Sequence, residues 1–364
     1  MRSILLLWVG VMCLARAAAS TAAAVPVPEL QEAQRAGWDT ASLLVQGMAS
    51  ADPRRFPGIH DWLKEYRTAG GTPGKRLASG QAVPGIDAER LVTRNPAFWR
   101  AYFEMAPGDP GTMLLHASLL LAGGEVSRSA YILIIARQTP VIAKPLLEAM
   151  NGLLQHSQRV LHGSLQHTAQ AAKLSDVGSP AQASARLRVL LDAWPGNALA
   201  HYELALALTA QQYVAAGRKP PTRSALSLHS DLEPGADAKA AYARARNHDP
   251  LLIRAYQGDD AATAEALAVL GQTVRPLWDI VSRDTQAETR DDVLRNLATA
   301  LRDAGLAELA LSTAQVVVGR EGGYDEDDRK AVAAALRVLA PAATNPVLKR
   351  LALPRPELAR IVLP

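Results

Sequence analysis

Residues 179–208 read SPAQASARLRVLLDAWPGNALAHYELALAL, and this stretch decides the fold. It holds two runs in which apolar residues recur three and four positions apart, the spacing that places side chains on one face of an α-helix. Pro195 and Gly196 stand between the runs and are typical of a turn. The stretch therefore predicts two consecutive helices joined by a short turn.

The composition of the whole chain also favours helices. Of 364 residues, 49% are hydrophobic and 20% are charged, which is ordinary for globular proteins and excludes disordered and collagen-like chains. Alanine accounts for 68 residues, and alanine favours helix over strand. No run of alternating β-branched residues indicates a sheet. We therefore predict an all-α fold.

The phase of the two runs resembles the tetratricopeptide repeat, in which 34-residue helical hairpins stack on one another. Its first helix reads W-x2-L-G-x2-Y, and its second reads A-x3-F-x2-A before a closing proline. The second-helix pattern is matched by Ala183, Leu187, Leu190 and Pro195. The four first-helix positions of the next unit are matched by His201, Leu204, Ala205 and Leu208. The resemblance implies a right-handed superhelix of helical hairpins, although His201 stands where the family prefers tryptophan.

The unit that begins near His201 is interrupted before its second helix. Its expected second-helix positions are Ala238, Tyr242 and Ala245, with Pro250 as the closing proline. Pro250 lies 55 residues after Pro195, which is 21 more than one repeat. An insertion at about residues 213–235 accounts for the excess, because insertions in such arrays lie in surface loops.

A third match lies further along the chain, in residues 294–317. It contains a first helix, a glycine turn and a second helix without interruption, on Leu294, Leu297, Ala298, Leu301, Gly305, Ala310, Ala314 and Val317. We expect Ala298 and Ala310 to lie where the two helices approach most closely.

The remaining segments predict further helices separated by proline and glycine. We expect a helix over residues 29–48, a Pro/Gly-rich loop over 51–86 with a short helix near 60–69, and two short helices within the apolar stretch 112–136. A single long helix is expected over residues 145–174, beginning with Pro145 in its first turn. Its expected buried stripe is Leu146, Met150, Leu153, Val160 or Leu161, and Leu165.

These segments suggest five parts of the chain. Residues 1–24 are expected to be a signal peptide and 25–95 an N-terminal helical cap. Residues 96–174 are expected to hold degenerate repeats and the long helix, and 175–340 the tetratricopeptide-like repeats. A proline-rich tail follows over 341–364.

The first residues predict export. Arg2, an apolar run over residues 4–14 and A-x-A-like sites are typical of a secretory signal peptide, with cleavage after Ala17, Ala19 or Ala24. Cleavage after Ala24 would remove two basic residues and no acidic one, which lowers the net charge from +4 to +2. A charge this small does not indicate nucleic-acid binding. It would also remove Cys13, the only cysteine. We expect a periplasmic or secreted protein without a membrane span in the mature chain.

Candidate catalytic and metal sites find little support in the sequence. His156, His162 and His167 share the long helix, but their spacing prevents them from meeting at one ion. Residues 70–76, GGTPGKR, lack the spacing of a phosphate-binding loop. The acidic run 325–328 lacks the spacing of a calcium loop and suits a helix N-terminus. We predict no metal, no cofactor and no enzymatic activity.

The predicted binding residues are those that the resemblance places in the concave groove and those of one aromatic cluster. In a tetratricopeptide array, first-helix residues outside the core stripe face the groove. These are Arg295, Thr299 and Arg302 in the third match, and Tyr202 and Leu206 in the earlier unit. Trp99 and Tyr102 form a second candidate patch, with a core position as the alternative.

The resulting functional hypothesis is a scaffold or adaptor of the bacterial cell envelope that binds a peptide or another protein without catalysis. A helical-solenoid enzyme acting on cell-wall glycan is one alternative, and a structural assembly subunit is another. The sequence indicates neither the partner nor the oligomeric state.

Overall fold

The computed structural model describes residues 27–93, 95–105, 109–137, 142–221 and 231–249. Within these ranges the chain is all-α and no strand occurs. The helices in chain order are α2 (Pro28–Ala49), α3 (Pro57–Thr68), the π-helical turn η1 (Glu89–Thr93), α4 (Pro96–Glu104), α5 (Pro110–Ala122), α6 (Val126–Ala136), α7 (Lys144–Asp176), α8 (Pro180–Ala193), α9 (Ala198–Ala215) and α11 (Ala236–His248).

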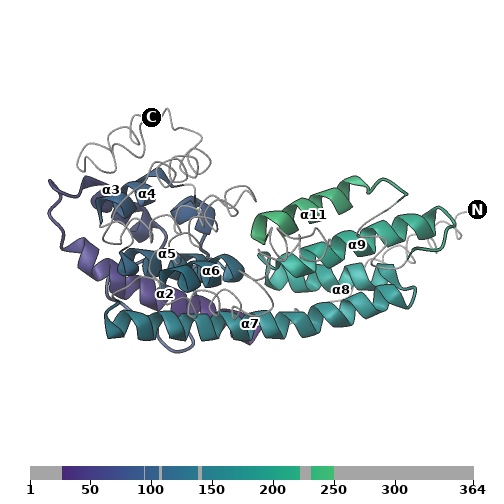
Figure 1. Ribbon diagram of the computed structural model, residues 1–364, viewed down its shortest axis with the longest axis horizontal. Coiled ribbons are helices and arrows are strands. Elements are labelled where there is room, and N and C mark those ends of the chain that lie inside the picture. The colour runs from purple at the N-terminus through teal and green to yellow at the C-terminus, as the bar shows by residue number, and fades with distance from the viewer. Residues whose placement is uncertain (1–26, 94, 106–108, 138–141, 222–230, 250–364) are drawn as a thin grey trace, which may run out of the picture.

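The long helix α7 spans two groups of helices. Figure 1 shows α7 along one edge of the molecule, with α2 to α6 over its first half and α8, α9 and α11 over its second half. Helix α7 packs against α2, α5 and α6 in the first group and against α8 and α9 in the second. The described helices therefore form an elongated arrangement in which most of them pack on neighbours in the chain.

The sequence itself sets where the helices begin. Proline occupies the first turn of six helices, where its missing N–H removes no helical hydrogen bond. At three of the starts the residue just before the helix caps it: the Asn95 oxygen accepts from the backbone N–H of Ala97, Asp109 accepts from that of Thr112, and Asn197 accepts from that of Ala200.

Helix α5 forms the centre of the first group. Every residue from Thr112 to Ala122 is buried, because α2, α6 and α7 surround this helix. The buried Ser129 hydroxyl of α6 donates to the Ala117 carbonyl of α5 at 2.7 Å. Gly37 of α2 lies so close to α5 that an added Cβ would stand 2.6 Å from the Ser118 carbonyl oxygen.

Aromatic side chains fill the core between α2, α3 and α4. The rings of Trp38 and Tyr66 lie 5.1 Å apart, those of Trp62 and Tyr66 5.4 Å, and those of Trp62 and Phe98 5.6 Å. Two polar atoms of this cluster have hydrogen-bond partners: Trp62 Nε1 donates to the Leu91 carbonyl, and the Tyr66 hydroxyl bonds the Ser42 hydroxyl. These hydrogen bonds therefore offset the free-energy cost of burying the two polar groups.

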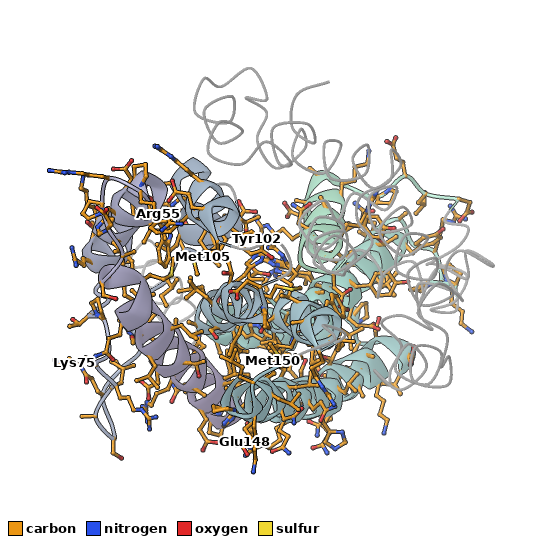
Figure 2. All side chains as sticks on the ribbon, turned by 60° about the vertical axis from the view of Figure 1, so that its left-hand side comes forward. Arg55, Lys75, Tyr102, Met105, Glu148 and Met150 are labelled. Carbon is orange, nitrogen blue, oxygen red and sulfur yellow. The ribbon has the colours of Figure 1, made fainter. Side chains whose placement is uncertain are left out.

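The inner face of α7 differs from the predicted stripe in its second half. Met150, Leu153 and Val160 are buried as expected, and Figure 2 shows Met150 on the inner side of the helix with Glu148 on the outer side. The prediction for Leu165 is wrong, because its side chain is 43% exposed. Ser164 is buried instead, since the capping residue Asn197 of α9 approaches it to 2.6 Å, from Nδ2 to Oγ.

The two hairpin turns that precede α6 and α9 lie against each other. Trp194 Nε1, in the turn between α8 and α9, donates to the Gly124 carbonyl at 2.9 Å. Gly124 has φ +84°, a left-handed conformation that favours glycine. An added Cβ at Gly196 would lie 2.8 Å from the same carbonyl oxygen. The turn sequences thus join the two groups through backbone contacts.

The structure confirms the predicted helices within the described ranges. The expected spans 29–48, 60–69 and 145–174 correspond to α2, α3 and α7, and the stretch 112–136 forms the two helices α5 and α6. Residues 70–76 lie in a loop, as expected. Helices α9 and α11 pack on each other across the predicted insertion. In the described part of the chain, no helix is long and apolar enough to cross a membrane.

Substitution of Gly37 tests the approach of α2 to α5. We expect Gly37→Ala to lower the free energy of unfolding by about 1–3 kcal/mol, because the new methyl group meets backbone atoms that cannot move aside. Chemical denaturation measures the change. Gly47→Ala is the matched control on the same helix, since an added Cβ there meets nothing within 4 Å. Equal stability of the two variants would contradict the close approach.

Candidate functional site

The predicted groove residues of α9 lie in a contact with α11. Tyr202 and Leu206 are 2% and 8% exposed. They form a small apolar cluster with Leu199, Tyr213 and Ala245, and the rings of Tyr202 and Tyr242 lie 6.4 Å apart. In the described part of the chain these residues therefore pack two helices together, and their proposed role in binding stays a prediction.

Tyr102, from the predicted aromatic patch on α4, belongs to the core. Tyr102 is 4% exposed, with its ring 5.9 Å from Phe98 and 6.2 Å from His116. Figure 2 shows Tyr102 directed toward the interior of its helix group. Trp99 lies on α4, but the structure does not describe its side chain. The predicted residues of the third match lie outside the described residues: Arg295, Thr299, Arg302, Ala298 and Ala310.

A cluster of ionisable groups joins α6 to the end of α11. His248, the last residue of α11, has its Nδ1 3.1 Å from both carboxylate oxygens of Glu125. Arg128 lies on the other side of this carboxylate, with Nη1 3.5 Å from Oε2, and its Nη2 donates to the Thr93 hydroxyl at 2.9 Å. We call Glu125, Arg128, Tyr131, His201, His248 and Asp249 the polar junction.

Tyr131 and Asp249 supply the second link of the polar junction. The Tyr131 hydroxyl donates to Asp249 Oδ2 at 2.7 Å, and both side chains are buried. Burial raises the pKa of the Tyr131 hydroxyl well above its ordinary value, and the Asp249 charge raises it further. The hydroxyl therefore stays protonated at neutral pH and acts as a hydrogen-bond donor.

His201 of α9 completes the polar junction. Its ring stacks on that of His248, with centroids 5.7 Å apart and planes 9° from parallel. His201 Nε2 lies 2.8 Å from the Pro195 carbonyl oxygen, which can only accept, so this nitrogen carries the proton. Nδ1 is buried without a partner in the described part of the chain. Burial, with the nearby charges of His248 and Arg244, lowers the pKa of His201 to about 4.

The geometry of the polar junction suits a structural role. Hydrogen bonds join Glu125 and Tyr131 to the end of α11, and His201 of α9 stacks on His248. Among the described residues, no hydrogen bond joins a serine or cysteine to either histidine. Nowhere in the described ranges do three or more histidine, cysteine or acidic residues gather as they would for a metal ion. The arrangement links the end of α11 to α6 and to Glu125 just before it, through side chains that lie more than 110 positions apart in the chain.

A second buried carboxylate also serves as a link. Glu104, at the end of α4, is 6% exposed and accepts from the backbone N–H groups of Gly58 and Ile59 at 2.8 and 3.1 Å. These groups begin α3, where the helix dipole favours a negative charge. Glu104 therefore caps α3 in the way that a side chain of α3 itself ordinarily would.

Sequence reasoning missed both of these features. It placed His201 at a repeat position normally held by tryptophan, but nothing in the spacing connected it to His248. The partners of Glu125 and Glu104 lie 123 and 46 residues away. Only the folded arrangement of the helices brings these residues together.

No known relative adds to this geometry. Comparison with protein families, with curated proteins and with solved structures finds no match for the chain. The assignment that follows therefore depends on the residues themselves.

Acidification tests the buried state of His201. Because its pKa is about 4 in the folded chain and about 6.5 when unfolded, the unfolded state takes up the proton first as the pH falls. We expect this residue to remove up to about 3 kcal/mol of stability between pH 6.5 and 4. Denaturant unfolding of the wild type and of His201→Gln, which does not titrate, measures the difference. Parallel pH profiles for the two proteins would show that His201 is not buried as described.

Removal of the Tyr131 hydroxyl tests the second link. We expect Tyr131→Phe to lower the free energy of unfolding by about 1–3 kcal/mol, because the buried Asp249 carboxylate loses a donor. Tyr213→Phe is the matched control: its hydroxyl bonds Asp231, whose side chain is 63% exposed and can bond water instead. The account requires the first substitution to cost clearly more than the second in thermal or chemical unfolding.

Proposed function

We propose that this chain is a tetratricopeptide-like scaffold of the bacterial cell envelope that binds a peptide or another protein without catalysis. The single observation that carries the proposal is the packing of α7, α8, α9 and α11 in chain order. In repeat arrays of this kind each helical hairpin buries its apolar face against the next, and the stack offers an extended surface to a partner.

The pairing of α9 with α11 supports the repeat interpretation. The two helices pack together although residues 216–235 separate them, as an insertion within one hairpin requires. Ala238 and Ala245, expected at second-helix positions, are both buried. Small side chains at these positions allow the close helix approach on which the family's hairpins depend.

Export is the second part of the proposal. The charged start, the apolar run and the small-residue sites of the first 24 residues support a cleavable signal peptide. Sequencing the N-terminus of the protein purified from the periplasm or the medium tests it. We expect a start at residue 18, 20 or 25, and an intact Met1 in cytoplasmic material alone would contradict it.

Recovery of a partner tests the binding role. Immobilised chain is incubated with envelope extract of the source cells, and each recovered protein is then purified and titrated against the chain by calorimetry. We expect at least one direct complex of defined stoichiometry. We also expect Arg295→Ala combined with Arg302→Ala to weaken it at least tenfold, while Arg188→Ala on the exposed face of α8 does not.

Two results would contradict these proposals separately. Undiminished affinity of the double variant would remove Arg295 and Arg302 from the binding surface and leave the scaffold role in place. Turnover of purified peptidoglycan by the chain, with no protein complex recovered, would instead favour the glycan-degrading enzyme.

A further inference from the structure

An open cavity lies where the first turn of α2 meets the middle of α7. Its volume is about 640 Å³, within the range of ligand-binding clefts. The cavity is lined by Glu29 of α2 and by Gln155, Gln158, Arg159, His162, Gly163 and Gln166 of α7. It shares no lining residue with the polar junction or with the residues predicted to bind a partner.

The α7 residues of this cavity form one continuous polar stripe. They recur at intervals of three and four positions, so they share one face of the helix, opposite the apolar face that packs on the core. Their side chains are exposed. From Gln155 to Gln166 the stripe runs for about 16 Å by helical rise, the length of about five residues of extended peptide.

The chemistry of the lining suits a polypeptide backbone. Each of the three glutamine side chains offers an N–H donor and a carbonyl acceptor, which match the alternating C=O and N–H groups of an extended peptide. Gly163 lies between them, and an added Cβ there would meet nothing within 4 Å, so a ligand can approach the helix backbone at this point. The lining has no tryptophan, tyrosine or phenylalanine on which a sugar ring would stack.

The charges of the lining further restrict the peptide. Arg159 presents a guanidinium, which pairs with carboxylates in a bidentate manner, and His162 lies one turn further along the same face. Among the described residues of the lining, Glu29 of α2 is the one carboxylate, so the acidic side chain of a ligand is favoured at Arg159 and disfavoured beside α2. We infer that this cavity, the α7 groove, binds a short extended peptide segment that carries an acidic side chain directed to Arg159. The inference rests on the proposed scaffold function and names a binding surface for it.

The test uses a phage-displayed library of random linear heptapeptides selected on the immobilised full chain. We expect the selected peptides to be enriched in aspartate or glutamate. Synthetic copies should bind with an affinity that falls at least tenfold in Arg159→Ala and in Gly163→Leu, because the first removes the charge and the second fills the groove.

Gly152→Leu provides the matched control. Gly152 also lies within α7, an added Cβ there meets nothing within 4 Å, and the residue does not line the cavity. Both leucine variants gain helix propensity, so we expect both to unfold at or above the wild-type temperature. Only Gly163→Leu should lose peptide binding.

Each outcome decides for or against the α7 groove. Selected peptides that bind Gly163→Leu and Arg159→Ala as well as wild type would overturn it, and a protein partner recovered as described above would still leave the scaffold role standing. Failure to select any peptide would overturn it as well, and binding of an N-acetylglucosamine tetrasaccharide that Gly163→Leu abolishes would then assign the groove to glycan.

Discussion

The packing of α7 against both helix groups is the constraint on which the rest of the structure depends. Along its inner face, large apolar residues such as Met150 and Leu153 give way to Ser157, Ser164 and Thr168, all of them buried. Small side chains let the neighbouring helices approach closely. The hydroxyl of Ser157 donates to the Leu153 carbonyl one turn earlier, and that of Thr168 donates to the Ser164 carbonyl, so burial of these polar groups leaves them bonded.

The polar junction and the hairpin turns provide further contacts between the two helix groups that α7 joins. Helix α7 holds the two groups on one side, while the bonds from His248 to Glu125 and from Tyr131 to Asp249 tie α11 to α6. The Trp194 bond to the Gly124 carbonyl lies at the turns between them. These contacts are polar and directional, and each ionisable partner is at least partly buried. They specify how α11 meets α6, whereas the apolar core supplies most of the stabilisation.

Much of the helical architecture could be predicted because its signals are local. The spacing of apolar residues located α2 and α7, proline in the first turn placed the start of α7, and the glycine pair at 123 and 124 divided the apolar stretch into α5 and α6. Pro57 was predicted to lie in a loop, whereas α3 begins with it. The exposed Leu165 shows the limit of this reasoning. Helical periodicity placed Leu165 in the core. In the structure Ser164 is buried there instead, where its hydroxyl oxygen accepts a hydrogen bond from Asn197 Nδ2.

The candidate sites were harder to predict because their signals are not local. Glu125 and Tyr131 bond His248 and Asp249, which lie more than 110 residues away, and spacing carries no information about such pairs. The α7 groove depends on the position of Glu29 beside α7, which the sequence likewise does not express. For His156, His162 and His167 the helix itself was informative: helical rise places His156 and His167 about 16 Å apart, and His162 points away from the face that they share.

Amide hydrogen exchange along α7 tests the central claim most directly, since both helix groups and the α7 groove require one uninterrupted helix. The account predicts that the buried-face amides of residues 150–172 exchange slowly and as one cooperative unit. Rapid exchange around Gly163, independent of the two ends, would show two separate helices there and would contradict the account.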